Sequence, residues 1–452
     1  MPAHKELLTA ASHARRDSSR PSFHIRPIAN RMGDPNGVIR YRGRYHLFFQ
    51  FNPVSIHKGK TCWGHMSSKN LIDWQYHDIA FTPDTGAGEE RCFSGSAIAH
   101  HGGVFVAYTS VLDWENDDFT QGWAWAHDKN LTQWERRPSG LLQRPPRVPK
   151  YKIATDWRDP YLFRRGAQTY MLIGCNMTRG SDIYTAPLLY RAMDRTLKNW
   201  EYRGMLHIFG QRDFPNAANM FLECPNIIKI GRKWILLGSP ESSVKYFIGR
   251  LDPDTATFHI ENTGFVSYAD KEFYYASYVM RDQRRGRHLM FAACFGDEVG
   301  HWRGVGAIPR EIAIHGNQLI QSPIREMKKL RLGRPITLRP GSKTTTTRPC
   351  FEIVGYIRPN ENMTITLSGR RKLTLFSDGR RLTMGTQEMP LDIKRPTAFR
   401  LFFDRSICEI FVGKTHTLSY MERGLGIKSI TVQGNPTTKL KLYHLRDAKF
   451  TE

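Results

Sequence analysis

A hairpin-like pattern recurs along residues 38–292 and constrains the fold more than any other feature of this chain. Each copy has two runs rich in aromatic and β-branched residues on either side of a glycine-bearing turn, which is typical of antiparallel β-hairpins. The turn glycines are Gly43, Gly103, Gly166, Gly231 and Gly286, and they are separated by 60, 63, 65 and 55 residues. Five units of similar length indicate a five-bladed β-propeller.

A second pattern repeats with the same period. Leu-x-x-Trp segments end at Trp74, Trp134 and Trp200, which lie 60 and 66 residues apart. We interpret these leucines and tryptophans as core packing rather than chemistry. Two independent signals with one period support the repeat.

The pattern changes near residues 321–347, where Lys, Arg, Pro and Gly are concentrated beside four consecutive threonines. Short alternating segments follow as far as residue 445, at a spacing typical of an antiparallel sandwich. The sequence therefore predicts an all-β fold, a five-bladed β-propeller followed by a C-terminal β-sandwich. The expected boundaries are 1–22 for a loose or helical lead-in, 23–325 for the propeller, 326–345 for a linker and 346–452 for the sandwich.

The chain of 452 residues is strongly basic, with 66 Lys and Arg against 42 Asp and Glu and a net charge of +24. Such a charge suggests nucleic-acid binding. The basic residues are spread along the whole chain, however, often as pairs in or near turns such as 164–165 and 284–285, and no nucleic-acid motif accompanies them. We favour a solvated basic surface and expect no specific nucleic acid as a partner. Polyanion binding is the alternative.

Three further absences bear on the class of protein. No stretch approaches the roughly 20 apolar residues that span a bilayer, so no membrane partner is expected. The seven cysteines are scattered without a Cys-x-x-Cys pair, which argues against a disulfide framework or a zinc site. The basic N-terminus lacks the apolar region of a signal peptide. We therefore expect a soluble cytoplasmic protein.

Three carboxylates stand out from the repeat. Asp34, Asp159 and Glu223 each lie in a short turn-like motif that precedes a hairpin, as three copies of one structural position. A ring of blades would bring them together at its centre, and cleavage of a glycosidic bond requires two carboxylates, one of them protonated. Each motif alone also has an ordinary reading, because Asp-Pro and Asn-Gly are common turn formers.

Several motifs together resemble a known family. In order along the chain they are GDPNG at 33–37, FFQFNP at 48–53, WGH at 63–65, FSG at 93–95, WRDP at 157–160 and ECP at 223–225. This series resembles the motifs of glycoside hydrolase family 32, which comprises invertases, inulinases, levanases and related fructosyltransferases. Residues 403–411 (FDRSICEIF) are similar to a segment of the family's C-terminal sandwich. The resemblance spans about residues 23–450.

The resemblance implies a retaining double displacement on a fructofuranosyl unit of sucrose, a fructo-oligosaccharide or a fructan. Asp34 would be the nucleophile, Glu223 the general acid/base, and Asp159 the transition-state stabiliser beside Arg158. Retention requires the two catalytic carboxyls to lie about 5–5.5 Å apart. The expected partner is a carbohydrate substrate, and no metal or organic cofactor is expected.

The resemblance also implies a set of substrate-binding residues. Gln50, Trp63, Phe93 and Ser94 match positions that line the fructose subsite, with Trp63 as an apolar wall. Arg158 is the basic residue next to the stabilising carboxylate. In the fifth blade, Asp270, Tyr275 and Trp302 are expected where that blade meets the leaving group.

Two departures from the family pattern concern the substrate. Gly33 stands where the family usually has Asn directly before the nucleophile, so an amide that contacts fructose is missing. Asn226 replaces the Asp that commonly follows the acid/base motif, and one fewer anion favours a lower pKa for Glu223. Residues 56–62 also differ from the usual pattern. These departures do not change the predicted reaction, but they leave the identity of the substrate undetermined.

Basic residues flank the motifs that are expected to face the pocket. Arg31, Lys58 and Lys60 suggest a substrate with a negative group, such as a phosphorylated fructoside. The alternative is that they are surface charges on loops.

Other functions remain open at this level. A related five-bladed enzyme for arabinofuranosides or xylosides would also use three carboxylates. A fructosyltransferase, including one that forms a difructose anhydride, would differ only in its acceptor. A sugar-binding propeller that has lost catalysis and a polyanion-binding propeller are the non-enzymatic alternatives.

Overall fold

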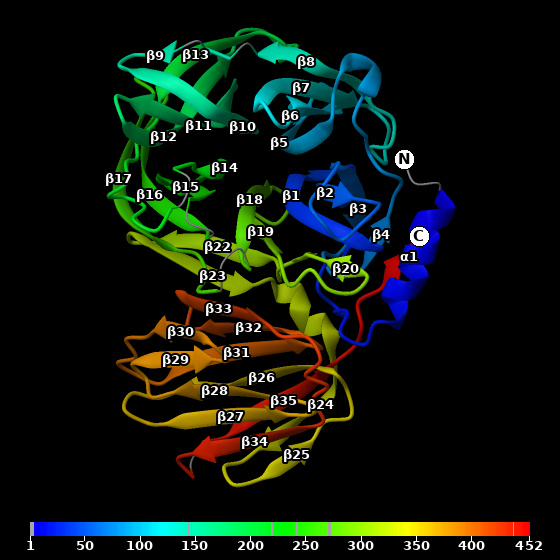
Figure 1. Cartoon of the computed structure of the whole chain (residues 1–452). Helices are drawn as coiled ribbons and strands as arrows, with labels where there is room; N and C mark the ends of the chain where they lie inside the picture. The colour runs from blue at the N-terminus through cyan, green and yellow to red at the C-terminus, as the bar shows by residue number, and fades with distance from the viewer. Residues whose placement is uncertain are drawn as a thin grey trace.

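The computed structural model shows five sheets of four to six strands arranged in a ring, with two six-stranded sheets stacked below them (Figure 1). It describes residues 4–142, 144–145, 147–217, 220–240, 243–269, 273–436 and 438–452. This confirms the predicted all-β architecture. None of the helices in these ranges is long and apolar enough to cross a membrane.

Each blade is an antiparallel meander whose first long strand lies nearest the axis. The first blade contains β1 (Asn30–Tyr41), β2 (Arg44–Asn52), β3 (Cys62–Ser68) and β4 (Trp74–Tyr76), and the second contains β5 (Arg91–His100), β6 (Gly103–Asp113), β7 (Asp118–Ala126) and β8 (Glu135–Leu142). The third contains β9 (Arg147–Val148), β10 (Tyr151–Arg165), β11 (Gln168–Arg179), β12 (Asp182–Ala192) and β13 (Trp200–Met205). The fourth contains β14 (Glu223–Ile230), β15 (Lys233–Ser239), β16 (Lys245–Asp252) and β17 (Thr257–Phe265), and the fifth contains β18 (Tyr275–Asp282), β19 (Arg287–Cys294), β21 (Val305–Gly306), β22 (Arg310–His315) and β23 (Gln318–Pro323). All five predicted hairpins are confirmed, and a short 3-10 helix, η1 (Thr85–Ala87), precedes the second blade.

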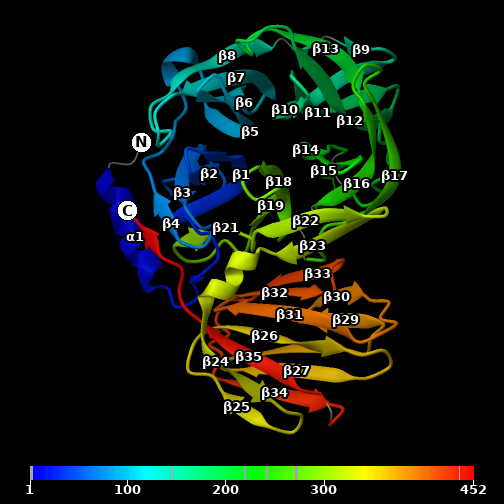
Figure 2. The same cartoon turned by 180° about the vertical axis from the view of Figure 1, so that it is seen from behind.

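The ring is closed by contacts between neighbouring inner strands: β1 with β5, β5 with β10, β10 with β14, β14 with β18, and β18 with β1. Later parts of the chain also border the first blade. β20 (Trp302–Arg303) pairs with β1 in parallel, and β36 (Phe450–Thr451) pairs with β4 in parallel. Both termini therefore lie beside this blade, as Figures 1 and 2 show. The two pairings cover edges that would otherwise expose unpaired backbone groups.

The residues of the Leu-x-x-Trp repeat form a turn as well as packing in the core. Leu71, Leu131 and Leu197 are buried and have positive φ values of 66°, 55° and 59°. The indole Nε1 groups of Trp134 and Trp200 donate hydrogen bonds to the carbonyls of Leu131 and Leu197 at 3.1 and 2.9 Å. In the second and third blades the tryptophan thus holds a left-handed turn that leads into the outer strand of its blade.

The C-terminal part forms two six-stranded sheets with a separate hydrophobic core. One sheet contains β24 (Arg331–Leu338), β26 (Cys350–Ile357), β31 (Thr397–Asp404), β32 (Ile407–Val412), β33 (His416–Met421) and β35 (Leu440–Leu445). The other contains β25 (Lys343–Thr345), β27 (Met363–Ser368), β28 (Lys372–Ser377), β29 (Arg381–Met384), β30 (Gln387–Pro390) and β34 (Ser429–Gly434).

The segment 326–345, expected as a linker, is instead part of this sandwich. After the 3-10 helix η2 (Arg325–Leu330), β24 and β25 each add an edge strand to a sheet. Most of β24 is exposed, and its Arg331 pairs with Glu352 at 2.7 Å. A polar edge strand has the composition of a linker, which is why the sequence did not distinguish the two.

The lead-in contains α1 (His4–Arg16), whose Ala11 and Ala14 pack against Ala29. Between this helix and β1, the backbone N–H groups of Ser22, Phe23 and His24 donate to the carboxylate of Asp404 at 2.6–2.9 Å. The segment that marks the family's sandwich therefore anchors the entry of the chain into the propeller.

A buried charge network joins the two parts. The His24 ring lies between Asp404, 2.8 Å from Nδ1, and Glu409, 3.1 Å from Nε2. Glu409 also accepts from the N–H of Ile308 at 2.7 Å and pairs with Arg310 at 3.3 Å. Burial alone would lower the pKa of His24, but its two carboxylate partners raise it to about 9. These carboxylates are thus matched by an imidazolium and a guanidinium.

We expect the stability to fall as the pH rises from 6.5 to 9.5. The folded pKa of His24 lies above its unfolded value of 6.5, so its contribution is complete below pH 6.5 and is lost as the pH passes about 9. The shift corresponds to up to roughly 3 kcal/mol. Thermal unfolding of His24→Gln should lack this slope. The exposed His259→Gln should retain it, and an equal slope in both variants would contradict the assignment.

Candidate active site

Each innermost strand is interrupted by a bulge, which lies near the N-terminal end in four blades and in the middle of β10 in the third. The register shifts lie between Met32 and Pro35, Cys92 and Gly95, Arg158 and Tyr161, Glu223 and Asn226, and Tyr275 and Tyr278. In three blades the first extra residue has a positive φ: 67° at Asp159, 50° at Cys224 and 46° at Ala276. A bulge bends a strand and redirects its side chains. Five bulges at one end of the ring therefore create a shared polar mouth.

The three carboxylates are not copies of one position, in contrast to the expectation from the sequence. Asp34 is the second unpaired residue of its bulge, Asp159 is the first of its own, and Glu223 is the paired residue just before a bulge. Because side chains alternate along a strand, carboxylates at three different positions relative to the bulge point in three different directions. The repeat brings the strands together, and these different positions let the carboxylates meet.

Cys224 lies at the centre of this group. Its thiol Sγ is 3.7 Å from Oδ2 of Asp34, and its backbone N–H donates to Oδ2 of Asp159 at 2.9 Å. Its neighbour in the chain is Glu223. Sequence reasoning treated this cysteine only as part of a motif. Its contacts show that all three carboxylates surround one residue of β14.

Asp34 is held by a short chain of hydrogen bonds. Ser94 Oγ donates to its Oδ2 at 2.7 Å, and Gln50 Nε2 donates to Ser94 Oγ at 2.7 Å. The side chain of Asp34 is buried. Burial and the negative charge of Glu223 raise the pKa of Asp34, while Ser94 and Arg31 act in the opposite direction.

Asp159 is fixed mainly through backbone groups. Its own N–H donates to Thr109 Oγ1 at 2.9 Å, and its carboxylate accepts from Cys224. Burial raises the pKa of Asp159 to about 7, and Arg158, 3.5 Å away, offsets this only in part. Thr109, opposite the bulge of the second blade, carried no motif that could have identified it.

Glu223 lies between a cation and a hydroxyl. Arg158 Nη1 is 2.8 Å from its Oε1, and the Tyr275 hydroxyl donates to its Oε2. Partial burial would raise the pKa of Glu223, but the Arg158 guanidinium and the Tyr275 hydroxyl lower it below its ordinary value. The direction agrees with the sequence-based expectation, yet the cause differs. Asn226 is turned to the carbonyls of Cys224 and Ser277, at 2.9 and 2.8 Å.

Five of the eight predicted substrate-binding residues lie in or beside this group. Gln50, Ser94, Arg158 and Tyr275 form the hydrogen bonds above. Phe93 is half-buried beside Ser94, with its ring 5.4 Å from that of the exposed Trp114. Phe93 and Trp114 therefore offer aromatic surface near the mouth.

The predicted substrate-binding role is wrong for two tryptophans. Trp63 is 0% exposed and donates its Nε1–H to the carbonyl of Phe93 at 2.9 Å, so it supports the site from behind and forms no wall. Trp302 is 1% exposed and donates to Asp17 at 2.8 Å, which places it against the lead-in. Large aromatic side chains can pack in the core between blades or line the sugar-binding mouth. The sequence alone did not reveal which of the two positions these tryptophans occupy. Asp270 lies outside the described residues.

The space next to Gly33 is already occupied. A Cβ atom on this glycine would lie 2.9 Å from Gln50 Cβ and 3.4 Å from Arg31 Nη1. Arg31 is buried and its charge acts on Asp34. A guanidinium therefore lies where the family pattern leads one to expect an amide.

A propeller mouth that holds two buried carboxylates and a half-buried one, with a sandwich fixed against the propeller, is the arrangement of a glycoside hydrolase. The family model for the glycosyl hydrolases family 32 N-terminal domain matches residues 24–323, and the chain belongs to this family. The resemblance drawn from the motifs is confirmed, and the enzyme is a hydrolase of β-fructofuranosides.

Known proteins similar over most of the chain agree with this assignment. A sucrose-6-phosphate hydrolase of Klebsiella pneumoniae is 28% identical over 88% of this chain and 86% of its own length. A cell wall isozyme of beta-fructofuranosidase from Pisum sativum is 30% identical over 73% of this chain and 64% of its own. The solved structure of a Bombyx mori GH32 beta-fructofuranosidase is 26% identical, has a TM-score of 0.84 and covers 98% of both chains.

Restoring the family's amide should impair this enzyme. In Gly33→Asn, the new Cβ would push Gln50 away from Ser94, and we expect kcat/KM for a fructoside to fall by about tenfold or more. Gly86→Asn, at an exposed glycine without a positive φ whose Cβ would come no closer than 3.4 Å to another atom, is the matched control and should stay close to wild type. Equal activity of both variants would show that the contact with Gln50 does not matter.

Proposed function

We propose that the enzyme hydrolyses sucrose 6-phosphate, releasing fructose with retention, and that Asp34, Glu223 and Asp159 carry the reaction. The observation that supports the phosphate most directly is the presence of two extra cations acting on the carboxylate group. Arg31 lowers the pKa of Asp34, and Lys58 lowers the pKa of Glu223.

In the proposed reaction, Asp34 attacks the anomeric carbon of fructose while Glu223 protonates the leaving oxygen. Glu223 then takes a proton from the water that releases the fructosyl group. Asp159 would accept hydrogen bonds from fructosyl hydroxyls, and Arg158 would balance the negative charge. The fixed N–H of Cys224 keeps Asp159 in place for this role.

The free site has the opposite proton distribution from the one this reaction needs. Arg158 and Tyr275 hold Glu223 as a carboxylate, whereas burial favours a proton on Asp34 or Asp159. These groups titrate together, so a change at one changes the others. A substrate that separates Arg158 from Glu223 would raise the pKa of Glu223 and move the proton to the leaving group's side.

Arg31 and Lys58 fit a substrate with negative charge. Arg31 is buried beside Asp34, so it is not a surface charge, whereas Lys58 is exposed on the loop after β2. That loop contacts the fifth blade through His57, whose Nδ1 is 2.9 Å from Glu298. A phosphate carries about two negative charges and is commonly bound by Lys and Arg. Lys60 is exposed, and it is not needed for the proposal.

We further infer that the enzyme works in the cytoplasm. All seven cysteines are free, and Cys224 lies against Asp34 and Asp159. An oxidising compartment would expose this half-buried thiol to modification within the site.

The roles of the two catalytic carboxylates can be separated by the leaving group. Asp34→Ala should lose roughly 10³-fold or more in kcat on every fructoside, because the nucleophile is needed throughout. Glu223→Ala should lose as much on sucrose 6-phosphate but far less on fructosyl fluoride with azide added, because fluoride leaves without a proton and azide attacks the fructosyl intermediate without the base that water requires. Product formation by chromatography measures both. The same loss in both variants on the fluoride would contradict the assigned roles.

The proposed recognition of a phosphate is tested by comparing sucrose 6-phosphate with sucrose as substrates. Wild type should show a higher kcat/KM for sucrose 6-phosphate than for sucrose, and Lys58→Gln should reduce that ratio severalfold while sucrose hydrolysis changes little. Lys69→Gln, on the opposite face of the propeller, is the control and should leave the ratio unchanged. Equal or better activity on sucrose in wild type would end the phosphate proposal and leave a neutral fructoside as substrate.

A further inference from the structure

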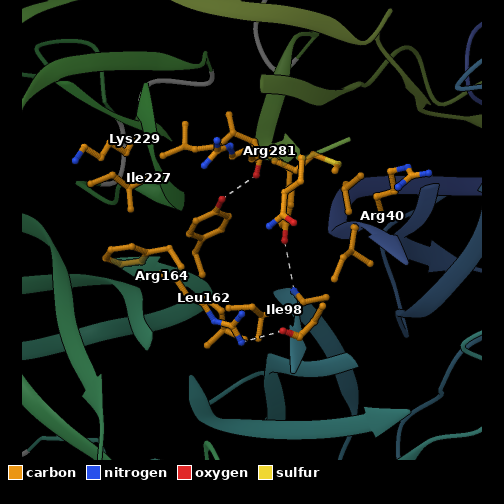
Figure 3. Close-up of a pocket in the computed structure, with 18 of the residues that line it drawn as sticks. Arg40, Ile98, Leu162, Arg164, Ile227, Lys229 and Arg281 are labelled. Atoms are coloured by element: carbon orange, nitrogen blue, oxygen red, sulfur yellow. Dashed lines mark hydrogen bonds between the residues drawn. The ribbon is translucent and has the colours of Figure 1, made fainter. Parts of the chain in front are cut away.

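A cavity lies at the other end of the propeller axis. It has a volume of about 360 Å³ and is lined by residues of all five innermost strands, by Trp234 of β15 and by the turn after β18. Figure 3 shows these strands converging on it. The cavity lies further along the innermost strands than the carboxylates, towards their C-terminal ends. Asp34 and Arg40 are six residues apart on β1, which corresponds to at most about 20 Å because bulges shorten the strand.

The walls of this axial cavity are apolar. Six of its lining residues are Ile39, Ala97, Ile98, Leu162, Ile227 and Val279. The two phenols that also line it are already engaged: Tyr161 donates to the carbonyl of Val279 at 2.8 Å, and Tyr278 accepts from the N–H of Ala97 at 3.4 Å. The interior therefore offers apolar surface and few free hydrogen-bonding groups.

The mouth of the axial cavity is basic. Arg40, Arg164, Lys229, Arg281 and Arg284 come from four of the five blades, and no carboxylate lines the cavity. None of these five side chains has an ion-pair partner within the part of the chain that the structure describes. The charges around the mouth are therefore not neutralised by the protein.

In the arginine pairs 164–165 and 284–285, only the arginine that lines the cavity lacks an ion-pair partner among the described residues. Arg165 pairs with Asp254 at 3.8 Å, and Arg285 pairs with Glu326. Their neighbours Arg164 and Arg284 line the cavity without a carboxylate. Asp282, the acid closest in sequence to this mouth, is buried and engaged by Arg287 at 3.1 Å. A merely solvated basic surface gives no reason for one arginine of each pair to be matched and the other to be left at the cavity.

We propose that the axial cavity binds a nucleoside diphosphate or triphosphate, with the base against the apolar walls and the phosphates at the basic mouth. The volume lies within the range of small-molecule sites. A sugar phosphate fits less well, because the apolar walls would leave its hydroxyls without hydrogen bonds. Inorganic phosphate would use the arginines and leave the walls unused. This site is separate from the fructoside site and does not depend on its proposed substrate.

Calorimetric titration with ADP tests the proposal. Wild type should bind ADP at least tenfold more tightly than adenosine, pyrophosphate or fructose 1,6-bisphosphate, and the affinity should fall as salt is added. The triple variant Arg40→Ser, Arg164→Ser, Arg281→Ser should lose ADP affinity by tenfold or more. Arg334→Ser, Arg339→Ser, Arg395→Ser removes the same charge from exposed sites on the sandwich and should bind ADP as wild type does.

A second variant separates shape from charge. Ala99 is an exposed lining residue, so Ala99→Trp should block the mouth without changing the charge and should also abolish ADP binding. Fructoside hydrolysis should be unchanged in the triple variant and in Ala99→Trp, because within the described residues no hydrogen bond or ion pair links the substituted side chains to Asp34, Asp159 or Glu223.

Several results would overturn the proposal. They are undetectable ADP binding, equal binding of adenosine or pyrophosphate, equal loss in the sandwich variant, retained binding in Ala99→Trp, and competition between ADP and fructose. Tighter binding of a short oligonucleotide than of ADP would also overturn it in favour of a polyanion surface.

Discussion

The closed ring of innermost strands is the constraint on which the other features depend. Once five strands run the same way around one axis, their N-terminal ends share one mouth and their C-terminal ends share the other. The bulges then decide which side chains reach the first mouth. The electrostatics follow from this convergence, because three carboxylates brought so close cannot all be ionised without cations such as Arg158 and Arg31.

The sequence predicted the elements of this ring but not their side-chain directions. Hairpins and blade number were readable because turn glycines and strand patterns are local signals. Asp34, Asp159 and Glu223 were readable because each lies in a distinctive motif. Trp63 and Trp302 were misplaced because burial depends on which face of a strand packs against the rest of the fold, and a motif in the sequence does not show that face. Segment 326–345 was missed because a polar edge strand resembles a connector.

The two ends of the axis differ in charge. Around one mouth the acids have partners at hydrogen-bonding distance. Around the other, the arginines have no ion-pair partner in the described part of the chain, although Arg164 donates to the carbonyl of Ala99 at 2.9 Å. The same short strands connect them, so Asp34 and Arg40, or Asp159 and Arg164, are a few residues apart. The basic residues of the chain therefore have two different roles. Some of them balance carboxylates, and others surround the second mouth and can bind an anion.

The pairing of β20 and β36 with the first blade also affects how the chain folds. The first blade is made early in synthesis, yet one of its edges is completed by β20, from within the fifth-blade segment, and the other by β36, after the sandwich. Contacts between residues so far apart in sequence are formed slowly and after a large loss of chain entropy. The growing chain must therefore keep the β1 edge unpaired until the fifth blade is made and the β4 edge unpaired until β36 is made, and aggregation competes with folding during that interval.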